Sequence, residues 1–288
     1  MTARVSPVSC ATELVFHGLA WLAVGSHPAS LWDPRYHSFA RERLPAECNA
    51  LFIDDGAVLG RRFVDRDLVA WHALPAMFEQ PSQIRAFAKT LTVNDPRAAS
   101  IIARCMKRDS EATEWFALDL AFAAPSFERA FERVVLPVLT AGCASLAPWI
   151  ERALRVDPAL GQFRVELSCV LGGRGRALGE DRLFTGALTE WSDHDLEHSV
   201  VQLLHERAVR GAGEVDYVCA EWSALVSLAR RLEGTEFERA HARWIARHDL
   251  TPLVAKAIER GYATATQCEG IVFGSSDGAT ALRRCPEL

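Results

Sequence analysis

The chain has 288 residues, of which 49% are hydrophobic and 24% are charged, and its formal net charge is -5. A chain of this length and composition can bury a substantial core, so intrinsic disorder is not the default expectation. The acidic balance argues against a general nucleic-acid or anionic-membrane binder, because both functions need a concentrated positive surface.

The N-terminus lacks a signal-peptide pattern, and no apolar run approaches the ~20 residues of a membrane span. We therefore expect a cytoplasmic protein that contacts neither nucleic acid nor membrane. The eight cysteines are widely scattered and include no CxxC pair. This spacing predicts reduced core thiols rather than a disulfide framework or a zinc ribbon.

Short helices are predicted over most of residues 1–155, where apolar residues recur at three- and four-residue spacings between prolines and glycines. Proline suits the first turn of a helix, and serine suits the position just before it. The candidate helices are 12–24, those that begin near Pro81 and Pro96, and 111–123, which Ser110 can cap.

The pattern changes at Gln162, because hydrophobic and polar residues alternate over 163–171 and predict a half-buried strand. The glycine-rich segment 172–179 can turn the chain, and 182–187 is the candidate partner strand. We therefore expect a hairpin. Residues 156–162 are the best boundary between two regions, if the chain has one.

Helical periodicity returns after Thr189. Ser192 and Asp193 can cap the first helix, and Gly211 and Gly213 can stop it. The further helices expected are 216–232, 236–247 and 252–260.

The predicted fold class is α+β, predominantly helical, with one small antiparallel sheet that packs against the helix Ser192 to Arg210. Residues 1–155 form a helical region, and residues 156–288 form a strand hairpin with helices. The two regions can also make a single intimate domain.

Three histidines of that helix, His194, His198 and His205, fall within about 40° of one another on its surface. His194 and His198 are one turn apart and can chelate one metal ion. His205 lies about 10.5 Å further along the axis, so the helix alone cannot supply a three-histidine site.

A metal at His194 and His198 needs ligands from elsewhere, and an exposed, polar helix start is the alternative interpretation. The helix dipole already explains the acidic residues of the first turn. The candidates for the missing ligands are Glu190, Asp195, Glu197, His241 and His248.

His205 and Glu206 form half of an HExxH device, in which two imidazoles one turn apart hold zinc and the glutamate activates water. Val209 stands where the second imidazole belongs. The order of strand, glycine-rich turn and His-Glu helix over 162–222 resembles the zincin-type metallopeptidases. This resemblance implies His205 as a ligand, Glu206 as the general base and Glu221 as the distal ligand, in a degenerate site.

Peptide binding by strand addition can survive the loss of a metal, because it uses backbone hydrogen bonds at a sheet edge. The glycine-rich turn can hold a carboxylate through its arginines, or it can be a simple hairpin loop. Most of the eight tryptophans are expected in the core. The candidate peptide-binding residues are Arg164, Glu166, Ser168, Arg174, Arg176, Trp191 and Trp222.

The size, the helical character and the hydrolase-like frame also give a weaker resemblance to peptide-binding proteins of bacterial gene clusters for ribosomally made, modified peptides, such as the crocagin-type pathway. This resemblance implies a pseudoenzyme that presents a precursor peptide to modifying enzymes and needs no cofactor. The alternative is an active, zinc-dependent hydrolase that uses His205 and Glu206 with ligands from distant segments. A helical scaffold without a ligand is the third possibility.

Overall fold

The computed structural model describes most of the second half of the chain and parts of the first half. The described ranges are 4–22, 33–45, 79–80, 82–83, 129–173, 175–178, 181–211, 217–248 and 250–263.

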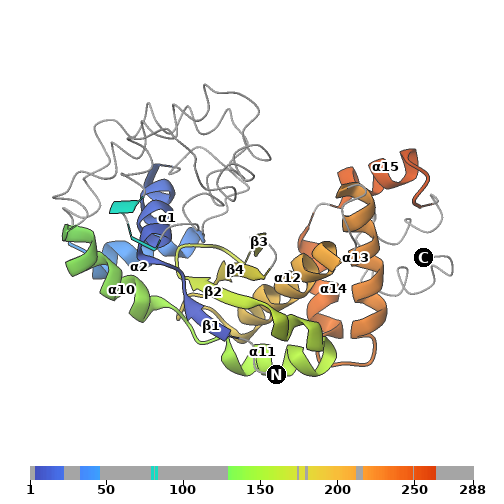
Figure 1. Cartoon of the computed structure of the whole chain (residues 1–288), viewed down its shortest axis with the longest axis horizontal. Helices are drawn as coiled ribbons and strands as arrows, with labels where there is room; N and C mark the ends of the chain where they lie inside the picture. Colours follow the sequence, from blue (N-terminus) through green and yellow to red (C-terminus); the bar gives the residue numbers. More distant parts are fainter. Residues whose placement is uncertain are drawn as a thin grey trace.

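The described part is mostly helical around one four-stranded sheet (Figure 1). The strands are β1 (Arg4–Pro7), β2 (Arg164–Ser168), β3 (Arg176–Leu178) and β4 (Arg182–Gly186). The helices are α1 (Cys10–Leu22), α2 (Pro34–Arg43), η2 (Phe131–Val135), α10 (Leu136–Gly142), α11 (Ala147–Val156), η3 (Pro158–Gln162), α12 (Asp193–Gly211), α13 (Tyr217–Leu232), α14 (Glu238–Arg247) and α15 (Thr251–Glu259).

The predominantly helical character is confirmed, but the predicted antiparallel sheet is wrong. The strand order is β1-β2-β4-β3, and β1, β2 and β4 all run parallel. Only the pairing of β3 with β4 is antiparallel within this sheet. The zincin-like α+β class with one small antiparallel sheet is therefore replaced by a helical protein with a mixed, mainly parallel sheet.

The error lies in the path of the glycine-rich segment. The chain does not return from β2 to an adjacent partner: β3, the next strand in sequence, lies on the far side of β4 and runs antiparallel to it. β4 therefore forms its hairpin with β3 and lies parallel to β2. The turn expected between two partner strands thus contains a strand of its own.

The predicted helices of the second half, 192–210, 216–232, 236–247 and 252–260, are confirmed to within two residues at each end as α12 to α15. In the first half, α1 matches the helix predicted over 12–24, shifted by two residues. The helices expected near Pro81 and Pro96 and over 111–123 lie outside the described residues, except that residues 82–83 are helical.

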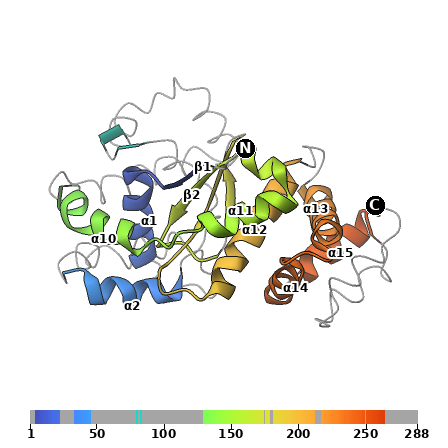
Figure 2. The same cartoon turned by 90° about the horizontal axis from the view of Figure 1, so that it is seen from below.

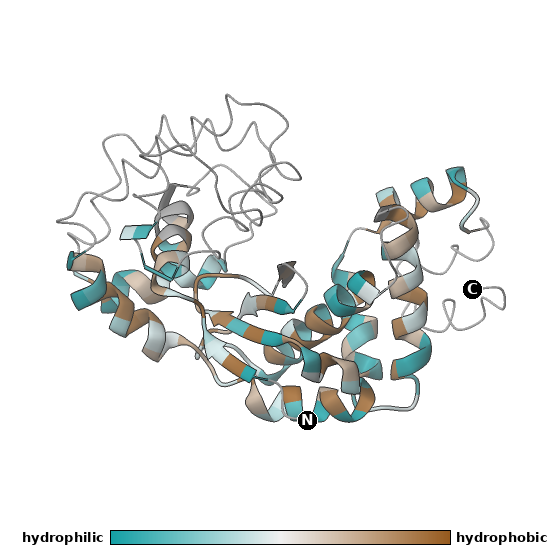
Figure 3. Cartoon of the chain, viewed as in Figure 1, coloured by the Kyte–Doolittle hydropathy of each residue, from teal (hydrophilic) through white to brown (hydrophobic). Residues whose placement is uncertain are grey.

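The two faces of the sheet pack against different helices (Figures 1 and 2). β2 alternates hydrophobic and hydrophilic residues, as Figure 3 shows. Val165, Leu167 and Leu183 join the main core, which continues into α11 to α15. On the other face, the ring of Phe184 lies 5.8 Å from the ring of Phe16 in α1. The sheet thus separates a surface next to α1 from a surface next to α12.

The start of α12 is fixed by a side-chain cap, as the sequence predicts for Ser192. The Ser192 Oγ accepts a hydrogen bond from the Asp195 backbone N–H, and the Asp195 carboxylate accepts one from the Ser192 N–H. Arg35 of α2 donates to the same carboxylate at 2.9 Å. α12 is therefore anchored to an N-terminal helix.

A buried carboxylate holds α12 and α13 in place. Asp157 is 2% exposed, and it lies 3.2 Å from Arg207 of α12 and 2.7 Å from Arg231 of α13. Its side chain also accepts a hydrogen bond from the Ala159 N–H at the start of η3. The two helices that carry the candidate site are thus joined through one residue.

Candidate functional site

The structure brings His205 and Glu221 together, although they lie on different helices. The Nε2 atom of His205 in α12 is 3.4 Å from the Oε2 atom of Glu221 in α13, and His205 is 3% exposed. This is the pair of metal ligands that the zincin resemblance implies. An imidazole and a carboxylate at this distance also make a charge-assisted hydrogen bond when the imidazole is protonated.

Glu206 uses both of its carboxylate oxygens in contacts with neighbouring elements. Its Oε2 accepts a hydrogen bond from the Ala177 backbone N–H of β3 at 3.3 Å. Its Oε1 accepts one from the Gln202 side chain at 2.9 Å. These bonds hold the carboxylate against the edge of the sheet.

Val209 lies in α12 where the second imidazole of a zinc-binding HExxH helix belongs, and no other donor replaces it in the described part of the chain. The one group of three metal-binding side chains found among those residues lies elsewhere, around Glu13. Within the described residues, His205 and Glu221 therefore do not belong to a group of three donor atoms that lie within 4.8 Å of one another.

The ring of His205 packs against an indole. The indole of Trp244 in α14 lies 4.7 Å from the His205 ring and 4.1 Å from that of His248, and its Nε1 donates to Gln202. His241 lies 6.1 Å from the same indole. We call Trp244, His205, Gln202, His241 and His248 the Trp244 cluster. The helical spacing of α14 predicts that one face is buried, but nothing in the sequence pairs that face with His205.

The alternative pair, His194 and His198, points to different partners. His194 is exposed and lies 3.5 Å from Glu197 on its own helix. The ring of His198 stacks on that of His248 at 5.5 Å, with an interplanar angle of 7°. Asp195 belongs to the cap of α12 and Glu197 to an ion pair with His194, so these two carboxylates have partners within the protein.

β2 is not an edge strand, so it offers no edge for strand addition over Arg164 to Ser168. It pairs with β1 on one side and with β4 on the other. Glu166 is 2% exposed and forms a bidentate pair with Arg182 at 3.0 and 2.6 Å. Ser168 is fully buried, whereas Arg164 is half exposed and contacts Glu166.

Both candidate tryptophans are buried. Trp222 lies in the core, and Trp191 donates its indole N–H to Asp33, with Arg35 over its ring. Arg174 lies outside the described residues, and Arg176 is described by its backbone alone, as part of β3. A groove lined by the two tryptophans is therefore not formed.

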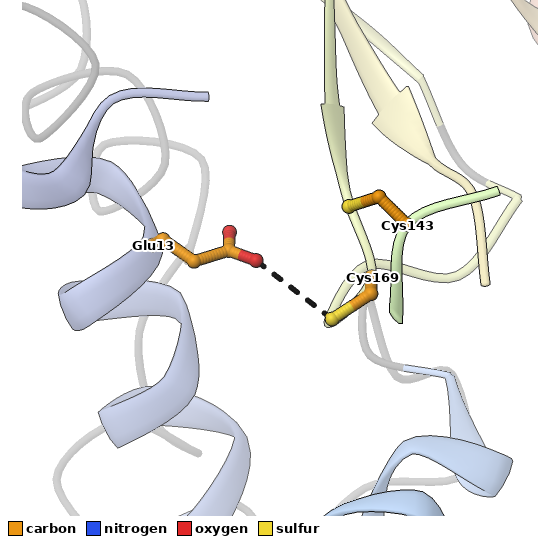
Figure 4. Close-up of side chains that lie close together, drawn as sticks. All are labelled: Glu13, Cys143 and Cys169. Carbon is orange, nitrogen blue, oxygen red and sulfur yellow. Dashed lines mark hydrogen bonds between the residues drawn. The ribbon is translucent and has the colours of Figure 1, made fainter. Parts of the chain in front are cut away.

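A second group of reactive side chains, shown in Figure 4, lies on the face of the sheet next to α1, away from α12. Glu13 of α1 faces Cys143, which follows α10, and Cys169, which follows β2. One ligand atom from each residue lies within 4.8 Å of the other two. The thiol of Cys169 donates to the Glu13 carboxylate at 3.8 Å.

Burial of Glu13 raises the pKa of its carboxyl group to about 7, although hydrogen bonds from Ser168 and Cys169 act in the opposite direction. Residue spacing could not reveal this group, because its members come from three distant segments. The only trace in the sequence is an acidic residue inside the apolar helix that begins at Cys10. These thiols were expected to be reduced core residues, and they are unbonded to one another.

His241 of the Trp244 cluster should contribute a loss of stability at acidic pH, which comparison with a variant lacking this imidazole isolates. Burial lowers the pKa of this imidazole from 6.5 to about 4, and its Nε2 has no hydrogen-bond partner within the described residues. The unfolded chain therefore binds a proton first as the pH falls below 6.5. Between pH 6.5 and 4 the free energy of unfolding should fall by about 3 kcal/mol from this group. Urea denaturation of the wild type and of His241→Phe at several pH values measures it, and equal slopes would contradict it.

Comparison of the chain with protein-family models, with curated proteins and with solved structures found no match. Among the described residues, no helix is both long enough and apolar enough to cross a membrane.

Proposed function

We propose that the chain is a non-catalytic peptide-binding protein whose binding site is the outer edge of β3 beside α12. The observation that carries this proposal is the hydrogen bond from the Ala177 N–H to the Glu206 carboxylate. It supports the presence of a backbone donor on a strand edge that is bonded to a side chain, which another acceptor can replace.

The pairing of β3 supports this location. β3 has β4 on one side and no further strand of the described sheet on the other. Strand residues direct their backbone groups alternately to the two sides. Ala177 donates to Glu206 and thus away from β4, so the carbonyl oxygen of an added peptide strand fits where the Glu206 oxygen lies.

The state of Glu206 favours binding over hydrolysis. A general base needs a free carboxylate oxygen beside a water molecule, whereas both oxygens of Glu206 accept hydrogen bonds from the protein. Val209 supplies no metal ligand. We further propose, from the resemblance to the modified-peptide pathways, that the bound peptide is a precursor peptide presented to modifying enzymes.

Two substitutions at this edge should change peptide binding in opposite directions. Ala177→Pro removes the backbone donor and should weaken binding about fivefold, since a hydrogen bond to a backbone group contributes roughly 1 kcal/mol. Glu206→Ala removes the competing acceptor and should strengthen binding about fivefold by the same reasoning. Fluorescence anisotropy measures both, with the tightest binder from a library of capped random-sequence peptides.

Glu151→Ala, which removes an exposed carboxylate of α11, is the control for the loss of one negative charge. Far-ultraviolet circular dichroism shows whether each variant is folded. Equal effects of Ala177→Pro and Glu206→Ala, in either direction, would place the peptide elsewhere. Charge reversal of Arg174 and Arg176 should weaken the binding of acidic peptides if the glycine-rich segment contributes to the same surface.

A metal-dependent hydrolase is the second candidate function, and the 3.4 Å approach of His205 Nε2 to Glu221 Oε2 favours it. In that case Glu206→Gln should keep the metal and lower turnover by about 100-fold or more, because the variant loses its general base. In a peptide-binding protein, Glu206→Gln retains a side-chain oxygen acceptor and should leave affinity nearly unchanged. Elemental analysis and peptide titration of this variant thus separate the two functions.

A further inference from the structure

We propose that Glu13, Cys143 and Cys169 form a binding site for a thiophilic divalent cation, zinc foremost. The site lies on the face of the sheet next to α1 and is independent of the peptide-binding edge beside α12. Failure of either proposal therefore leaves the other intact.

The donor chemistry fits such an ion. Two cysteine sulfurs and one carboxylate oxygen belong to the ligand types that zinc uses in proteins. Neighbouring donors in a tetrahedral zinc site lie about 3.5 to 3.8 Å apart. The Glu13 oxygen and the Cys169 sulfur are 3.8 Å apart, and all three donor atoms lie within 4.8 Å. Small rotations of these side chains bring them into coordination.

The environment of the Glu13 carboxylate favours the binding of a cation. Glu13 is 3% exposed, its Oε2 has no hydrogen-bond partner within the described residues, and no ion pair involves it there. A buried, unpaired carboxylate is costly, and a bound cation removes that cost. The Oε2 atom thus remains available to a ligand, in addition to the Oε1 atom that accepts from Cys169.

The backbone around the three residues is held by regular structure, so the donors are preorganised. Glu13 lies in α1, and Cys169 directly follows β2 at the centre of the sheet. Cys143 pairs with Leu188 through an isolated bridge, and its thiol donates to the Leu167 carbonyl. Cys143 is half-buried, whereas Cys169 is fully buried, so the ion would reach the site from the side of Cys143.

Coordination releases the thiol protons to solvent, together with the proton of the Glu13 carboxyl group when it carries one, because zinc binds the thiolate and the carboxylate. Three protein donors leave the fourth tetrahedral position to water or to a further ligand. Both thiols must be reduced, and a disulfide between Cys143 and Cys169 would remove the site.

The test is a cobalt titration of the untagged full-length chain, stripped with a chelator and kept reduced with a phosphine. Cobalt(II) should bind one ion per chain with thiolate-to-cobalt charge-transfer absorption, which added zinc should abolish. Cys143→Ser and Glu13→Gln should each lower cobalt affinity by about tenfold or more. Cys219→Ser removes a half-buried thiol of α13 and is the matched control, with unchanged affinity expected.

Three results would overturn the proposal. The first is cobalt binding without thiolate absorption, which would assign the ion to histidines. The second is an absorption that persists in Cys143→Ser. The third is a Cys143–Cys169 disulfide, found by peptide mapping of chain purified under the same reducing conditions. If Glu13→Gln does not fold, as judged by circular dichroism, Glu13→Asp replaces it and should weaken cobalt binding by shortening the ligand.

Discussion

Replacing Gly186 with alanine should destabilise the protein by about 3 kcal/mol or more. A Cβ atom at this position would lie 2.0 Å from the Leu171 carbonyl oxygen and 2.3 Å from that of Gly172. Both contacts are with backbone, which cannot rotate away as a side chain can, so β4 and the loop after β2 must separate. Urea denaturation of the two proteins measures the difference.

The effect should reach the peptide-binding edge, because the Gly186 carbonyl accepts a hydrogen bond from Ser199 of α12 at 3.0 Å. Gly211→Ala is the matched control. Gly211 ends α12, and nothing lies within 4 Å of a Cβ atom built there. This change should be neutral, or stabilise by up to about 1 kcal/mol. A Gly186→Ala protein as stable as Gly211→Ala would show that the loop after β2 is not packed as described.

Replacing Trp222 with alanine should cost about 3 to 5 kcal/mol of folding free energy. The side chain is fully buried in the core formed by the sheet and α11 to α15. Truncation therefore removes a large apolar surface and leaves a cavity. Trp222→Phe should cost much less, because the indole N–H has no hydrogen-bond partner within the described residues. Guanidinium denaturation of both variants measures these differences.

Trp149→Ala is the control for the loss of an indole. Trp149 is half-buried at the margin of the same core, with Arg152 over its ring, and its truncation should cost less than half as much. Trp222→Ala with unchanged stability but without peptide binding would restore the groove role that the sequence suggested for this residue.

The sequence predicted those elements whose signals are local. α12 has its capping serine at Ser192 and ends at Gly211, and β2 has a period of two. The direction of the sheet depended on distant partners. β1 has only four residues and no clear alternation, and β3 lies inside a glycine-rich stretch typical of a turn. Neither strand could be assigned from its own residues.

The residues of the candidate sites were likewise hard to predict where their environment depends on distant parts of the chain. His205 and Glu221 lie on consecutive helices and approach to 3.4 Å, whereas their proposed role as ligands came from the resemblance alone. Trp222 carries no local sign of its environment, because a tryptophan on an amphipathic helix can face a core or a groove. Glu13, Cys143 and Cys169 become neighbours only when α1 packs on the sheet. No spacing motif exists for such a group.

The sheet topology also sets a condition on the time course of folding. β1 pairs with β2, which follows it by more than half of the chain length. Ribosomal synthesis therefore releases β1 long before its partner, and this strand stays unpaired until residues 164–168 have emerged. Closing so long a loop is entropically costly, and chains rich in such distant contacts fold slowly. We expect docking of the N-terminal strand, with α1 attached to it, to be the late event of folding, so the sheet face that carries Glu13 is completed last.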